Sequence, residues 1–159
     1  MSILNAPIRI LGCGSLLMGN DGVGLKVIEA LHKSELKDRE DIDIEDVGVC
    51  GLDLLNYLDG ARKVIIVDAM LANTPPGSVH RIRGEDLIND VELSSLISVH
   101  DLNITDVLKI AEHVQTLPEV VVIGIEIGEL VTEATLEISP EVLKGMDEAI
   151  KLIREEISS

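Results

Sequence analysis

The chain has 159 residues, 46% of them hydrophobic, which suits one domain over residues 1–159 that buries about 70% of its unfolded surface. The formal net charge is −16, with one Tyr and no Phe or Trp; this field repels phosphate backbones and offers no base-stacking platform, which excludes nucleic acid as a partner. No segment approaches the roughly 20 apolar residues that cross a bilayer, and no signal peptide is recognisable, so we expect a cytoplasmic protein without a membrane partner.

The first half of the chain alternates between strand and helix patterns. The apolar run Ile8–Leu11 predicts a strand buried on both faces. A glycine-dense turn follows, and an apolar stripe at helical spacing then predicts a helix from Gly22 to about Ser34. The elements expected next are a strand over 42–47, a short helix over 52–58 and a β-branched strand over 63–68.

The second half begins with a break in this rhythm. A turn cluster over 73–77 leads into a strand over 78–82, and the link of about nine residues is too short for a parallel crossover, so we expect an antiparallel edge strand. The elements expected next are a loop with one or two helical turns over 84–99, a helix from an Asn103 cap to about His113, a strand over 119–127 and a terminal helix capped by Ser139 with Pro140 in its first turn. The core stripe expected for the terminal helix is Val142, Leu143, Met146, Ala149, Ile150 and Ile153.

This alternation predicts an α/β fold, a three-layer α/β/α sandwich with a mostly parallel five-stranded sheet and one antiparallel edge strand. Ligands of such sheets bind outside the carboxyl ends of the strands. That rule places Asp21, after the first strand, and Asp68, at the end of the third, at the same edge. The two strands are neighbours if the order is 2-1-3, and the loop that carries His100 should reach the same edge.

Asp21, Asp68 and His100 together offer two carboxylates and one imidazole, which suit Zn, Ni, Mn or Fe as divalent ions. Three protein ligands would leave coordination positions open for a substrate. Each residue also has an ordinary interpretation. Asp21 could cap the following helix, Asp68 could bind backbone amides at a strand end, and His100 could be an unremarkable loop histidine.

Several other kinds of site do not fit the residues. The dinucleotide fingerprint needs glycine where Leu17 stands, and a phospho-acceptor receiver domain needs an acidic pair after the first strand. Neither a Walker motif nor a serine-nucleophile elbow is present. The two cysteines, Cys13 and Cys50, match no zinc-site spacing, and we expect small buried thiols rather than a disulfide.

Three motifs in order resemble those of the hydrogenase maturation endopeptidases. The segment Gly12–Gly24 is similar to the family's N-terminal signature, from which it departs at Ser15 and Asn20. The other matching segments are Val64–Val67 with Asp68-Ala69 and the Pro76-Gly77 turn, then Ser98-Val99-His100, and in the C-terminal third Gly124-Ile125-Glu126 and Leu136–Val142. The resemblance covers nearly the whole chain and carries the family's metal ligands and catalytic residues to Asp21, Asp68 and His100.

The resemblance implies an endopeptidase that removes the C-terminal extension of a [NiFe] hydrogenase large-subunit precursor after nickel insertion. The partner is then that precursor, the nickel is carried by the substrate, and the protein acts as a monomer. No tightly held resident metal is expected, although Zn or Cd could replace nickel in a crystal. Two alternatives remain open at this point: a non-proteolytic nickel-sensing chaperone and a nucleotide-binding α/β module.

Overall fold

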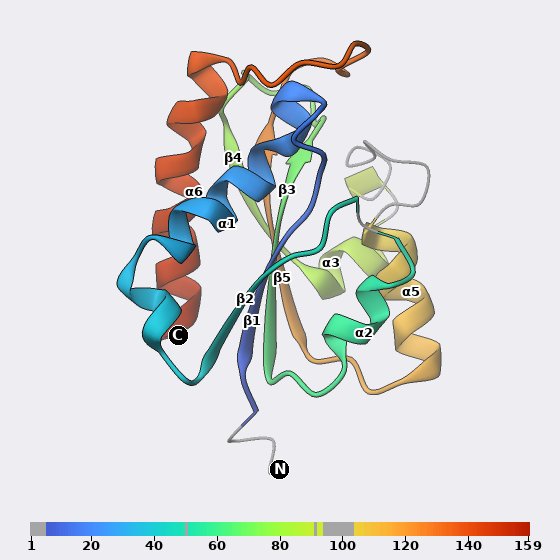
Figure 1. The fold of residues 1–159 in the computed structure, drawn as a ribbon. Coiled ribbons are helices and arrows are strands. Elements are labelled where there is room, and N and C mark those ends of the chain that lie inside the picture. Colours follow the sequence, from blue (N-terminus) through green and yellow to red (C-terminus); the bar gives the residue numbers. More distant parts are fainter. Residues whose placement is uncertain (1–5, 50, 91, 94–103) are drawn as a thin grey trace.

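Five strands form one mixed sheet in the order β2-β1-β3-β5-β4 (Figure 1). The computed structural model describes residues 6–49, 51–90, 92–93 and 104–159. The strands are β1 Ile8–Gly12, β2 Ile42–Asp46, β3 Lys63–Met70, β4 Val79–Arg83 and β5 Glu119–Glu126. The first, second, third and fifth strands run parallel, and β4 pairs with β5 antiparallel at the edge. The predicted 2-1-3 order and the antiparallel edge strand are both confirmed.

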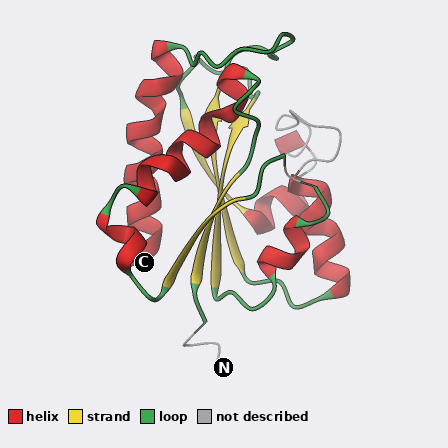
Figure 2. Ribbon diagram, in the orientation of Figure 1, coloured by secondary structure: helices red, strands yellow, loops and turns green. Residues whose placement is uncertain are grey.

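Helices cover both faces of this sheet, with α1 and α6 on one side and α2, α3 and α5 on the other, as Figure 2 shows. The helices are α1 Val23–His32, α2 Leu54–Leu58, α3 Gly84–Asn89, α5 Ile104–Val114 and α6 Pro140–Ser158, with short 3-10 turns η2 Gly19–Gly22 and η3 Glu35–Asp38. The three-layer α/β/α architecture is therefore confirmed. Within the described ranges, no helix is both long and apolar enough to cross a bilayer. The predicted Asn103 cap lies outside those ranges.

The central strand β3 is buried along its whole length because both faces are covered. Its side chains alternate between two cores. Ile65 and Val67 join the core beneath α1 and α6, whereas Ile66 and Met70 join the core beneath α2, α3 and α5. By the same alternation, Asp68 belongs to the second of these faces.

The terminal helix α6 begins as predicted, because the Ser139 side chain accepts a hydrogen bond from the Val142 N–H and Pro140 occupies the first turn. One position of its predicted core stripe is wrong, since Leu143 is 46% exposed. Val142 is buried as predicted, and Gly145 is buried in addition. A Cβ at Gly145 would come within 2.7 Å of the Gly77 carbonyl. This close approach fixes the rotation of α6 and turns Leu143 outward.

Candidate active site

The carboxyl ends of β1 and β3 meet at the upper rim of the sheet in Figure 1. The register pairs Gly12 with Val67, and the Cys13 N–H donates a 2.9 Å hydrogen bond to the Val67 carbonyl. Asp68 is the next residue of β3. Asp68 is only 6% exposed, and Asp21, which lies in η2, is only 7% exposed. Because η2 packs against β3, both predicted carboxylates lie at one rim of the sheet.

Two glycines make the turn between β1 and α1 possible. Gly14 has a φ of +132°, and a Cβ there would lie 2.1 Å from the Asp21 carbonyl oxygen. At Gly24 a Cβ would lie 2.4 Å from the Val67 carbonyl oxygen and 2.6 Å from that of Cys13. Because Gly14 has no side chain, the turn can pack against the backbone of Asp21. Because Gly24 has none, α1 can start directly against the end of β3.

Replacing Gly24 with alanine should therefore destabilise the fold. Both oxygens that the new Cβ would meet belong to the backbone, so β1, β3 or α1 must shift, and overpacking of this kind costs about 1–3 kcal/mol. Chemical denaturation of Gly24→Ala measures this loss. Gly51→Ala is the matched control, because the nearest atom to its Cβ is an Asp53 oxygen at 3.6 Å. Equal unfolding free energies for the two variants would contradict the prediction.

The Asp21 carboxylate does not cap the following helix. Its Oδ2 accepts a 3.2 Å hydrogen bond from the Ser15 N–H, which belongs to the preceding turn. The N-cap of α1 is Gly22, and no side chain caps it. The ordinary interpretation of Asp21 as a cap is therefore wrong, because Asp21 lies within η2 and its carboxylate binds the preceding turn.

The ordinary interpretation of Asp68, a carboxylate that binds backbone amides at a strand end, is confirmed for one amide. Its Oδ1 accepts a 2.8 Å hydrogen bond from the Ala69 N–H, as expected for a carboxylate at a strand end. The third predicted residue, His100, lies outside the described residues. In the part of the chain that the structure describes, no three His, Cys, Asp or Glu side chains gather as a metal site. The structure thus places Asp21 and Asp68 at one rim, and the ligand role of all three residues stays a prediction.

Cys13 corrects the expectation of two reduced cysteines. It is fully buried beside this rim and is disulfide-bonded. The chain's other cysteine, Cys50, lies outside the described residues. The turn after β1 does lie against the chain that follows β2, because Gly14 donates a 2.8 Å hydrogen bond from its N–H to the Gly48 carbonyl. Sequence spacing alone carries no information about such a contact.

Glu126 is a buried carboxylate at this rim that was not among the predicted site residues. The register pairs Asp68 with Gly124 and Met70 with Glu126, so Glu126 lies two positions beyond the level of Asp68 on the same face. Its Oε1 accepts hydrogen bonds from the N–H groups of Ala72 and Thr74, at 2.8 and 3.0 Å, and from the Thr74 hydroxyl at 3.0 Å.

The second oxygen of Glu126 completes this arrangement by accepting a 3.1 Å hydrogen bond from the Gly128 N–H. Burial raises the pKa of Glu126, but the backbone N–H groups of Thr74, Ala72 and Gly128 together with the Thr74 hydroxyl outweigh it and hold the pKa below its ordinary value. The Thr74 hydroxyl also lies 3.0 Å from Nε2 of His80. Glu126 therefore fixes the connection that follows Met70, the last residue of β3.

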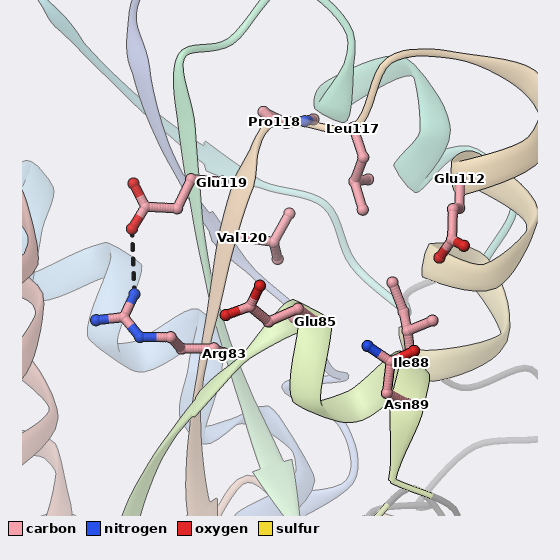
Figure 3. A pocket seen from close by; sticks show the side chains of 10 residues that line it. Arg83, Glu85, Ile88, Asn89, Glu112, Leu117, Pro118, Glu119 and Val120 are labelled. Carbon is pink, nitrogen blue, oxygen red and sulfur yellow. Dashed lines mark hydrogen bonds and ion pairs between the residues drawn. The ribbon is translucent and has the colours of Figure 1, made fainter.

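A separate cavity of about 600 Å³ lies between α3, α5 and the start of β5 (Figure 3). It combines the Arg83–Glu119 ion pair, 3.2 Å long, with the carboxylates of Glu85 and Glu112. Glu119 precedes Gly124 by five residues, or roughly 16 Å at the rise of a strand, so this cavity lies at the amino end of β5, away from Asp68. It is not part of the rim site.

Comparison with known proteins relates this chain to hydrogenase maturation proteases both by sequence and by fold. The family model for hydrogenase maturation proteases matches residues 25–156. The putative hydrogenase maturation protease of Methanocaldococcus jannaschii is 34% identical over 154 residues, which are 94% of this chain and 96% of the relative. The hydrogenase 2 maturation protease of Escherichia coli is 29% identical over 102 residues, 64% of this chain and 60% of that protein.

Among solved structures, the hydrogenase 2 maturation peptidase of the Thaumarchaeota archaeon SCGC_AB-539-E09 superposes with a TM-score of 0.70 at 28% identity, over 96% of this chain and 98% of the other. The Thermococcus kodakarensis maturation protease HycI shares the fold, with a TM-score of 0.72 at 22% identity over 99% and 100% of the two chains. The family match, the sequence relatives and the fold agree, and this chain belongs to the hydrogenase maturation protease family.

Proposed function

We propose that this protein is the endopeptidase that removes the C-terminal extension of a [NiFe] hydrogenase large-subunit precursor once nickel has been inserted. Membership of the family supports a peptidase active on hydrogenase precursors. The observation that carries the site assignment is the placement of two largely buried carboxylates, Asp21 and Asp68, at one rim of the family's fold.

In this proposal Asp21, Asp68 and His100 contact the nickel that the precursor already carries. Carboxylate oxygens and an imidazole nitrogen suit a borderline divalent ion. Binding the ion would hold the neighbouring peptide bond in place, and alignment of this kind lowers a reaction barrier by several kcal/mol. The protein then needs no resident metal, and Zn or Cd would occupy the same three ligands when nickel is absent.

The nucleophile proposed is water, which attacks the carbonyl carbon of the scissile peptide. A carboxylate at the rim would take the proton of this water, or the substrate's metal ion would lower the water's pKa. The proton then passes to the leaving amine as the peptide C–N bond breaks. Gly14 and Gly24 shape the turn that carries Asp21 to the rim, because a side chain at either position would collide with the backbone.

Purified protein and purified precursor test this function in one experiment. Nickel-loaded and nickel-free large-subunit precursors from the source organism are incubated with the protein, and their masses are followed by mass spectrometry. Loss of the C-terminal extension from the nickel-loaded precursor alone is the expected result. Binding without any change in precursor mass would contradict the proposal and would instead identify a nickel-sensing chaperone.

A further inference from the structure

Exposed apolar side chains gather around the rim that carries Asp21 and Asp68. Among the described residues, nine large hydrophobic side chains are exposed, and six of them follow the carboxyl ends of β1, β2 and β5. These six, which we call the apolar rim, are Leu16, Leu17, Val49, Leu52, Leu130 and Leu136. Leu136 is 73% exposed and Leu17 is 66% exposed, so neither is filling the core. Such clustering around buried carboxylates is typical of an interaction surface.

The apolar rim rests on backbone hydrogen bonds between distant segments. The Thr135 N–H donates a 2.8 Å hydrogen bond to the Leu17 carbonyl, and the Gly19 N–H donates one of 2.7 Å to the Thr135 carbonyl. Asn20 accepts a further bond, 2.9 Å long, from the Ser139 N–H to its Oδ1. The segment after β5 is therefore fixed beside the turn that carries Asp21, at the top of Figure 1. The leucines of both segments belong to one preformed surface.

The segments that form the same surface carry acidic side chains and no Lys or Arg. The segments 13–22, 47–53, 71–78 and 127–139 contain no Lys or Arg, and they carry Asp21, Asp53, Glu129, Glu133 and Glu137. Several basic side chains are paired elsewhere. These pairs are Arg39 with Asp41, Lys63 and Arg81 with Glu156, Arg83 with Glu119, and Arg154 with Glu35. In the part of the chain that the structure describes, no Lys or Arg pairs with Asp53, Glu129, Glu133 or Glu137, and the charge of these four carboxylates is left for a partner to neutralise.

We propose that the apolar rim docks a segment of the precursor that is both aliphatic and rich in Lys or Arg, an inference that rests on the proposed function. Leucines would bury the partner's aliphatic side chains, and the rim carboxylates would select its basic ones and speed their encounter. A second copy of this chain is a poor occupant, because it would bring the same net charge of −16 against the rim.

The apolar part of the inference is tested with Leu136→Asn. Loss of one buried leucine contact should raise the KM for the nickel-loaded precursor about tenfold and leave kcat unchanged. Val114→Asn is the matched control, because Val114 is 64% exposed at the end of α5, away from the rim, and it should keep the wild-type KM. Equal KM values for wild type, Leu136→Asn and Val114→Asn would overturn the docking proposal while leaving the peptidase function intact.

The preference for basic segments is tested by binding alone, without cleavage. A negative result here is therefore distinguishable from failure of the proposed peptidase function. Two synthetic peptides of equal length and leucine content, one with four lysines and one with four glutamates, are titrated against the protein. The lysine peptide should bind, and Glu133→Lys/Glu137→Lys should weaken it at least tenfold. Asp147→Lys/Glu148→Lys makes the same charge change on exposed positions of α6 and should weaken it less than threefold. Equal weakening by both double variants would show attraction to net charge alone and overturn the proposal.

Discussion

Asp68→Asn should abolish processing of the nickel-loaded precursor and leave the fold intact. The amide keeps the size of the carboxylate and an oxygen that can accept the 2.8 Å bond from the Ala69 N–H, but it removes the negative charge that a metal ion requires. Loss of even an outer-sphere partner of a metal ligand costs about 10–100-fold, so the cleavage rate should fall by more than that. A mass-spectrometric time course measures the rate, and denaturant unfolding measures the stability.

Asp46→Asn is the control for this change. Asp46 also ends a strand of the sheet, and its Oδ1 accepts a 2.9 Å hydrogen bond from the Gly48 N–H, but its side chain is exposed. It should process the precursor within about twofold of the wild-type rate, since an exposed charge is well screened. Full-speed cleavage by Asp68→Asn would remove the proposed site. Unfolding of Asp68→Asn at a much lower denaturant concentration would show that Asp68 holds the fold rather than the substrate.

The sheet was predictable because short-range rules decide its topology. Residues 71–78, which join β3 to β4, are too few to span a parallel crossover, so the antiparallel pairing of β4 is a consequence of loop length. The unbroken β-branched run from Val64 to Val67 can only be a strand covered on both faces. Asp21 and Asp68 then reach one rim because parallel strands present their carboxyl ends together.

The remaining features depend on contacts between distant residues, which a local pattern does not encode. The rotation of α6 follows from the approach of Gly145 to Gly77, so Leu143 fits a helical stripe and still faces outward. The hydrogen bonds of Glu126 join residues 52 and 54 positions apart. The sequence signal for Glu126 was a carboxylate at the end of an apolar strand, the same signal that singled out Asp68.

Glu126→Leu should destabilise the protein by at least about 3 kcal/mol at pH 7. The change removes the charged acceptor of three part-buried N–H groups, those of Ala72, Thr74 and Gly128, and each hydrogen bond to a charged group contributes about 1.5–3 kcal/mol. Glu119→Leu, at the other end of the same strand, should cost less than about 1 kcal/mol. Its ion pair with Arg83 is half exposed, and the buried Lys63, 3.8 Å from Glu119, keeps its 3.0 Å ion pair with Glu156. Equilibrium unfolding in denaturant compares the two variants, and similar losses would show that the hydrogen bonds of Glu126 add little.

The same hydrogen bonds predict how stability depends on pH. The pKa of Glu126 in the folded protein lies below its ordinary value of 4.5, so the unfolded chain takes up this proton first as the pH falls. The stabilisation from the carboxylate is therefore complete above pH 4.5 and is lost as the pH falls through the lowered pKa. Glu126→Gln cannot titrate, and its deficit relative to wild type should be largest near pH 7 and shrink towards pH 3. Because all other carboxylates titrate in both proteins, the difference between the two stability curves isolates Glu126, and a deficit that stays constant with pH would contradict this role.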